Sequence, residues 1–123
     1  MKKSYVFYGD PLAMKFRALD RFQHAHQKQQ QTTMAIDLQE QHEQDRMFDG
    51  PLSFEITFYM KMANSAKQGS YHAAKPNLRD LMHFYRLMCE EILFKQDCTI
   101  AKETCMKIYD KHPRTFITIE ELS

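Results

Sequence analysis

A period-two alternation of apolar and polar side chains marks residues 53–61 as the clearest strand of the chain. Its apolar members are Phe54, Ile56, Phe58 and Met60. Since successive side chains of a strand point to opposite faces of a sheet, this alternation predicts a half-buried strand. Shorter apolar runs predict three further strands at 4–8, 104–109 and 115–120, the last two joined as a hairpin by the turn at 110–113.

A helical period replaces the alternation at residues 77–93. The apolar positions of this segment recur three or four residues apart and are Leu78, Leu81, Met82, Tyr85, Met88, Cys89 and Ile92. They form one continuous stripe, which predicts a helix packed on the sheet. Residues 19–48 are rich in Gln and His and predict one or two polar helices, with Ala35, Leu38 and Met34 on the buried side.

The order strand, helix, strand, helix, strand, strand predicts an α+β fold in which helices cover a small mixed sheet. The chain has 123 residues, of which 43% are hydrophobic, so we expect residues 1–123 to form one domain with its own core. We expect neither a membrane span nor a secretion leader, because no apolar run is long enough. The three cysteines lack metal-ligand spacing and favour a reducing, cytoplasmic location.

The formal net charge is only +1, but basic residues gather in one segment. Four cations and no acid lie between residues 61 and 79: Lys61, Lys67, Lys75 and Arg79. Gly69 and its serine neighbours predict an exposed loop there. A cationic loop of this kind could neutralise the phosphates of DNA, and the alternative is an ordinary solvated loop.

Two segments on either side of the predicted helix carry a resemblance to a known family. They read KPNLRDL at 75–81 and KQDCTI at 95–100. The chain resembles the RusA-type Holliday junction resolvases, in which these segments read roughly Lys-Pro-Asp-x-Asp-Asn-Leu and Asp-Asp-x-Gln-Ile. The opening at residues 8–17 and the tail at 107–119 are also similar to that family. The resemblance implies a homodimeric α+β protein of DNA recombination and repair, which binds four-way junctions and nicks them with Mg²⁺.

Carried over by position, the resemblance points to a site with altered residues. The three metal-binding acids of the family fall on Asn77, Arg79 and Asp97, so two of the three are replaced. The Asn after the second acid falls on Asp80, and the catalytic Lys falls on His83. The candidate metal ligands are therefore Asp97, Asp80 and Asn77, and the candidate catalytic residues are Asp97, Asp80 and His83. The candidate DNA-binding residues are Lys15, Arg17, Lys67, Lys75 and Arg79.

Two arrangements of these residues are possible. In the first, Asp80 replaces a lost ligand beside Asp97, Asn77 completes the shell, and His83 acts as a base or a transition-state cation. In the second, the guanidinium of Arg79 takes the place of the metal and binds a phosphate, which would preserve binding and abolish cleavage.

A purely structural alternative exists for the same residues. Asn77 and Asp80 have the spacing of a helix N-terminal capping box, and Asp97 has the setting of a turn residue. We therefore expect a branched-DNA binding protein with weak or lost Mg²⁺-dependent cleavage. The alternatives are a non-catalytic dimeric interaction module derived from this fold, or a module with no DNA role. The latter would be favoured if the basic loop were buried or paired with the acids of residues 37–49.

Overall fold

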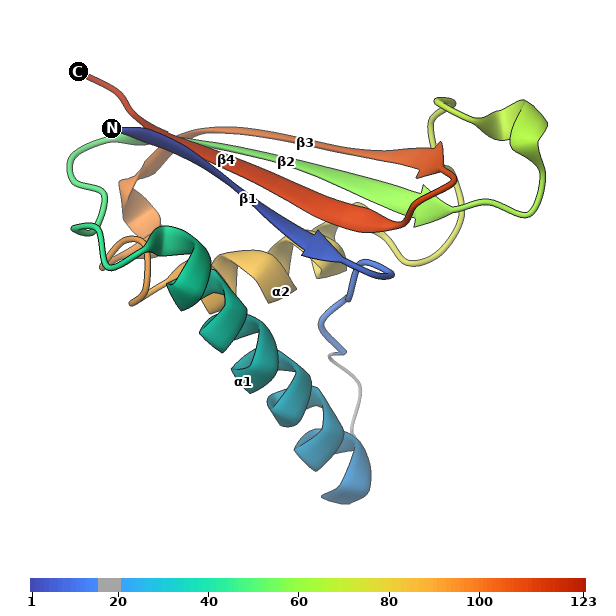
Figure 1. Ribbon diagram of the computed structural model, residues 1–123, viewed down its shortest axis with the longest axis horizontal. Helices are drawn as coiled ribbons and strands as arrows, with labels where there is room; N and C mark the ends of the chain where they lie inside the picture. Colours follow the sequence, from blue (N-terminus) through green and yellow to red (C-terminus); the bar gives the residue numbers. More distant parts are fainter. Residues whose placement is uncertain (16–20) are drawn as a thin grey trace.

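The computed structural model describes residues 1–15 and 21–123. In chain order its main elements are β1 (Lys2–Tyr8), α1 (Arg21–His42), β2 (Leu52–Lys61), α2 (Leu78–Cys89), β3 (Ile100–Asp110) and β4 (Arg114–Glu121). Two single 3-10 turns lie at Ser65–Lys67 and Asp97–Thr99. The four strands form one mixed sheet, and both helices lie on the same face of it (Figure 1). The predicted α+β class is confirmed.

The predicted hairpin of the last two strands is wrong. The sheet order is β1-β4-β2-β3, so β2 lies between β3 and β4, parallel to β3 and antiparallel to β4. The most deeply buried side chains of β2, each at most 2% exposed, are Leu52, Phe54, Ile56 and Phe58. Such a strand belongs in the centre, where both of its backbone edges are paired. β3 suits the edge because its residues 101–104 are exposed.

A short link at residues 111–113 carries the chain from β3 past the end of β2 to β4. Asp110 organises this link, since its Oδ2 accepts hydrogen bonds from the backbone N–H of His112 at 3.0 Å and from Arg114 at 2.6 Å. Arg114 also lies 3.7 Å above the centre of the Tyr59 ring on β2. The hydrogen bonds from the His112 backbone and the Arg114 side chain lower the pKa of Asp110 to about 2.

The apolar face of α2 packs on the sheet. Its buried residues are Leu81, Met82, Phe84, Tyr85, Met88 and Cys89. The helix ends at Cys89, short of the predicted Ile92 and Leu93, because the chain turns sharply: Glu91 has a φ of 73°. Leu93 and Phe94 then enter the core from this turn.

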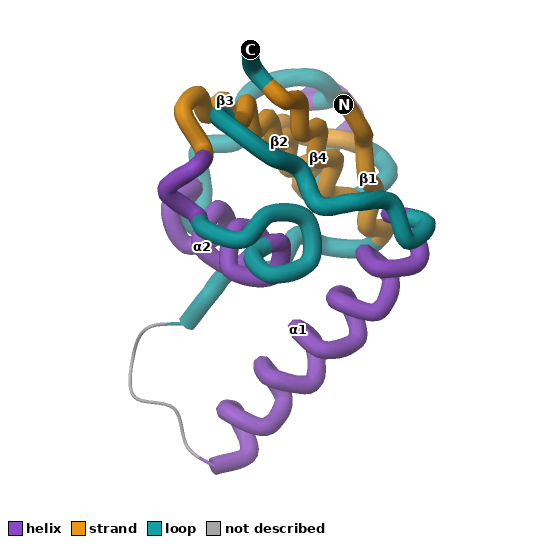
Figure 2. Tube along the Cα trace, turned by 90° about the vertical axis from the view of Figure 1, so that its left-hand side faces the viewer, coloured by secondary structure: helices purple, strands orange, loops and turns teal. Residues whose placement is uncertain are grey.

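The second half of α1 packs against the sheet, and its first half projects beyond it (Figure 2). Leu38 is buried while Met34 and Ala35 are partly buried, as predicted. His42, at the end of the helix, is buried between the Tyr5 hydroxyl, 2.7 Å from Nδ1, and the Arg46 carbonyl, 3.0 Å from Nε2. Among the described residues, no helix combines the length and apolar character needed to cross a membrane.

The opposite face of the sheet carries no helix, and we call it the outer sheet face (Figure 1). Because cross-strand partners share a face, the strand register places two rows of side chains on it. One row is Val6, Phe116, Thr57 and Met106, and the next is Tyr8, Arg114, Tyr59 and Ile108. Phe116 keeps 40% of its surface exposed and Tyr8 keeps 82%. This apolar surface is therefore open to solvent in a single chain.

Replacing Asp110 by Asn should remove stability that the wild-type protein loses in acid. The folded-state pKa of about 2 lies below the ordinary value of 3.8, so the ionised carboxylate stabilises the fold above about pH 4. This contribution disappears as the pH falls through about 2. We expect Asp110→Asn to lower the urea midpoint at neutral pH and to flatten its acid decline, as measured by circular dichroism. Asp37→Asn, which changes an exposed carboxylate on α1, is the control. A decline as steep as that of the wild type would contradict the assignment.

Candidate functional site

The start of α2 is fixed by a side-chain cap. Asn77 has extended backbone angles, and its Oδ1 accepts a hydrogen bond from the backbone N–H of Asp80 at 2.9 Å. This satisfies one of the free N–H groups at the helix start, and the acidic Asp80 suits the positive end of the helix dipole. The capping role of Asn77 is therefore confirmed, and its amide oxygen is engaged by the helix.

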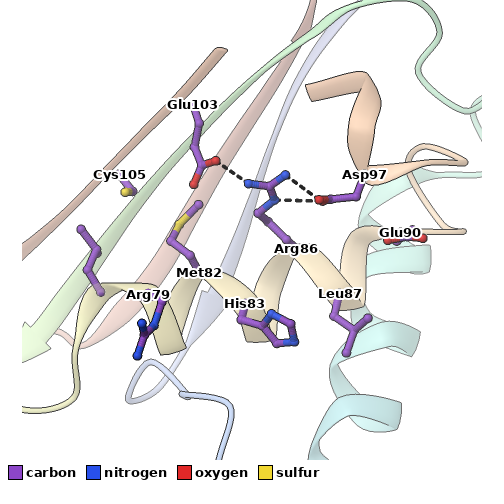
Figure 3. A pocket seen from close by; sticks show the side chains of 10 residues that line it. Arg79, Met82, His83, Arg86, Leu87, Glu90, Asp97, Glu103 and Cys105 are labelled. Atoms are coloured by element: carbon purple, nitrogen blue, oxygen red, sulfur yellow. Dashed lines mark hydrogen bonds and ion pairs between the residues drawn. The ribbon is translucent and has the colours of Figure 1, made fainter. Parts of the chain in front are cut away.

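Arg79, which the resemblance aligns with a metal-binding acid, points to solvent. Its side chain is 85% exposed, and its Nε lies 3.8 Å from Oδ1 of Asp80. Figure 3 shows it directed away from Asp97. The Arg79 guanidinium is therefore not the group that holds Asp97.

Another arginine holds Asp97. Arg86, in the last turn of α2, donates from Nε to Oδ1 of Asp97 at 2.9 Å and from Nη2 to Oδ2 at 2.7 Å. Its third nitrogen, Nη1, forms an ion pair with Glu103 on β3 (Figure 3). Such a bidentate, charge-assisted pair fixes both the position and the charge of the carboxylate. The guanidinium therefore lies between two acids, as a bound cation would.

These three residues line a hollow of about 540 Å³ between α2 and β3, which we call the Arg86 pocket. His83 also lines it, together with the thiol-bearing Cys105. Burial and the nearby Glu103 raise the pKa of the Cys105 thiol, which disfavours a thiolate nucleophile there.

Asp80 and Asp97 do not form one site. Asp97 lines the Arg86 pocket, whereas Asp80 lines a separate groove on the other side of α2. Residues 80 and 86 are about 9 Å apart along the helix axis and point to different sides of it, at 1.5 Å and 100° per residue. His83 accordingly shares a hollow with Asp97 and not with Asp80.

The residues present do not fit the Mg²⁺ that the resemblance implies. Mg²⁺ needs several hard oxygen ligands in an octahedron. Here the amide oxygen of Asn77 caps a helix, both oxygens of Asp97 accept from Arg86, and Arg79 is a cation. Within residues 1–15 and 21–123, no group of three or more His, Cys, Asp or Glu side chains could hold a metal ion.

The predicted DNA-binding residues are brought together in part. Lys15, Lys75 and Arg79 line one groove of about 1300 Å³, bounded by the first half of α1, residues 11–15 and residues 73–80. We call it the Phe22 groove, after the aromatic side chain on its α1 wall. Lys67 lies outside it, with its Nζ 5.3 Å above the Tyr109 ring. Arg17 lies outside the described residues.

Lys107 is a further cation of this groove and was not among the predicted DNA-binding residues. Its Nζ donates to the carbonyls of Ala74 and Pro76, at 2.8 Å each, and so fastens the wall of the groove to β3. The strand alternation places it on the helix-covered face with Glu103 and Cys105. That alternation was the available signal for both Lys107 and Glu103, whereas the partners of Arg86 lie on segments distant in the sequence and gave no local signal.

The basic loop is exposed and lies along β3. Gly69 donates a backbone hydrogen bond to Tyr109, and His72 donates one to Lys107, at 2.9 Å each. Burial and the neighbouring Lys107 lower the pKa of His72, which keeps this ring neutral at physiological pH. In the described part of the chain, no ion pair joins the loop to the acids of residues 37–49. The condition that would favour a module without a DNA role is therefore not met.

Comparison with known proteins agrees with this architecture. The family model of endodeoxyribonuclease RusA matches residues 16–120, which include both segments of the altered site and all of the strands except β1. No curated protein matches the chain. Nucleases of the matched family act on branched DNA in recombination and are generally metal-dependent. Since the match spans most of the sequence, the chain belongs to the RusA endodeoxyribonuclease family.

Proposed function

We propose that this protein binds branched DNA as a homodimer and has lost Mg²⁺-dependent cleavage. The observation that carries the proposal is the bidentate pair between Arg86 and Asp97. Asp97 is the one acid left at an inherited ligand position, and its two oxygens are already neutralised by a guanidinium. A divalent ion would have to displace that guanidinium.

The displacement is electrostatically unfavourable. Two unit charges 4 Å apart interact by about 4 kcal/mol at an effective dielectric near 20, and a divalent ion doubles this. Arg86 cannot relieve the repulsion by losing its proton, since a guanidinium stays charged in proteins. Glu103 also holds Arg86 in place from the other side. Without a metal to polarise the phosphate and activate water, the inherited chemistry is absent.

The binding function rests on different groups, which remain available. Lys15, Lys75 and Arg79 are exposed along the Phe22 groove, and Lys67 is exposed on the basic loop. Cations placed in this way release counterions when they contact phosphates, whatever the state of the cleavage site. Binding can therefore persist after cleavage is lost.

The outer sheet face supports the homodimer. It is an apolar surface without a helix to cover it, and two sheets can pack face to face at about 10 Å. Two copies related by a two-fold axis would bury the Val6 and Phe116 row of each against the other. Each copy would then present its basic loop and its Phe22 groove away from the interface.

We expect the protein to bind a four-way junction more tightly than linear duplex, with an affinity that falls steeply in salt. Neutralising Lys67 and Lys75 together to Gln should reduce the slope of log K against log salt by about two. The control is the double change Lys2→Gln with Lys95→Gln, which removes the same charge from the opposite end of the sheet. Fluorescence anisotropy over a salt series measures both. Negligible binding of junction and duplex at low salt would contradict the proposal and favour the protein-interaction module.

We expect no junction nicking by the wild-type protein in Mg²⁺. Arg86→Gln should lower the free energy of unfolding by about 1 kcal/mol, because the partly exposed carboxylates of Asp97 and Glu103 lose the cation that they share. The freed acids should then bind Mn²⁺, so the ion should raise the melting temperature of this variant and not that of the wild type. Arg79→Gln removes an equal charge beside the same pocket, and Mn²⁺ should leave the melting temperature of this variant unchanged, as in the wild type. Robust wild-type nicking that disappears in Asp97→Asn would refute the loss of cleavage.

We expect sedimentation to give the wild-type protein a molecular mass of twice the 14.7 kDa of one chain. Phe116→Lys should give a folded monomer, because it places a charge at the centre of the outer sheet face. Leu87→Lys is the control, since Leu87 is a half-exposed leucine on the helix side of the molecule. Analytical ultracentrifugation with circular dichroism separates dissociation from unfolding. A wild-type monomer at micromolar concentration would exclude the dimer.

A further inference from the structure

The Phe22 groove has an aromatic side chain that nothing in the described structure covers. Phe22 lies in the first turns of α1 and is 83% exposed. A single exposed apolar residue is ordinary on a protein surface. This one, however, stands on an otherwise polar stretch of helix and lines a groove with Lys15, Lys75 and Arg79. An exposed ring beside several cations is the combination that binds unpaired nucleotides.

The polar lining of the groove suits bases as well as phosphates. His26 and the amides of Gln23 and Gln30 lie on the same wall as Phe22. The Gln27 side-chain oxygen accepts a hydrogen bond from the backbone N–H of Lys15 at 3.0 Å. This bond holds the segment that carries Lys15 against α1. The Gln30 amide and the His26 imidazole can donate to or accept from base edges.

One acid, Asp80, also lines the groove and must be reconciled with an anionic ligand. Its Oδ1 is buried and has no hydrogen-bond donor in the described residues, although Arg79 lies 3.8 Å away. The carboxylate repels phosphates from its own position but can accept a hydrogen bond from the exocyclic amine of a base. Because the cations outnumber this acid, the groove as a whole remains complementary to a polyanion.

We propose that the Phe22 groove binds a single-stranded DNA segment, such as unpaired nucleotides at a branch point, with one base stacked on Phe22. This inference rests on the proposed DNA-binding function. A stacking ring requires a base with a free face, and bases within a duplex have none. The groove is open, and its volume of about 1300 Å³ exceeds the roughly 300–1000 Å³ of typical small-molecule pockets, which favours a continuous strand over a free nucleotide.

The sequence contains no tryptophan, so Phe22→Trp introduces a single fluorophore at the stacking position. The probes are an oligothymidine of about 15 nucleotides, within the range of known single-strand sites, a junction with unpaired nucleotides at its centre, and a linear duplex. We expect the oligothymidine and the junction with unpaired nucleotides to quench the indole emission of the Phe22→Trp variant. The duplex should leave the emission unchanged, even where anisotropy shows that it is bound.

Phe22→Ala should weaken oligothymidine binding about tenfold and leave duplex binding unchanged. Phe22→Trp should retain the wild-type affinity, because it keeps an aromatic ring. The control is Ile36→Ala, since Ile36 is a half-exposed apolar residue on the same helix outside the groove. Circular dichroism checks that each variant is folded.

The outcomes distinguish this inference from the function on which it rests. The inference would be overturned if the wild type bound the junction, the Phe22→Trp variant showed no quenching, and Phe22→Ala bound oligothymidine as tightly as the wild type. Branched-DNA binding would then remain intact. Equal quenching by duplex and single strand would overturn it as well, since stacking would then not be the cause. Absence of any DNA binding by the wild type would overturn both.

Discussion

The burial of the apolar face of α2 against the sheet is the constraint on which the site depends. The contacts of Tyr85 show how closely α2 is held against the sheet. Its ring packs near Phe7, Phe58 and Phe84, and its hydroxyl accepts hydrogen bonds from the backbone N–H of Leu12 and the hydroxyl of Thr115, both at 3.1 Å. One side chain thereby connects α2 to three strands and to the segment after β1. With this face fixed, the rotation of the helix is fixed too.

The fixed rotation divides the polar residues of α2 between two hollows. Arg86 faces β3 and the turn that carries Asp97 (Figure 3), and His83 lines the same hollow, whereas Asp80 lines the groove beside α1. The two surviving candidate acids are therefore held apart by the packing of the helix that carries the first of them. The second of these acids, Asp97, is paired with Arg86 of α2. A guanidinium supplies the positive charge that keeps the local fold together but offers no exchangeable ligand position.

Local periodicity predicted much of this structure. The alternation over residues 53–61 identified β2, and the helical stripe identified α2, because both depend on which side chains must be buried. The spacing of Asn77 and Asp80 predicted the cap, which involves only neighbouring residues.

The features that periodicity missed depend on distant partners. The hairpin prediction failed because no local signal shows that β2 inserts between β3 and β4. Arg86 was overlooked because, in the sequence, it is simply a polar residue on the outward side of a helix. Its two acidic partners come from a turn and a strand that only the fold brings to it. The family resemblance pointed to Asn77, Arg79 and Asp97 but not to Arg86, the residue that pairs with Asp97.

The basic loop has one more role, which follows from its position along β3. Tyr71 forms an antiparallel bridge with Ile108, and the hydrogen bonds of Gly69 and His72 occupy backbone groups on the free side of that strand. An exposed strand edge can pair with the edge of another molecule and lead to aggregation. The loop that carries Lys67 therefore shields the end of β3 from such pairing, and its positive charge opposes the approach of a second copy of the same edge.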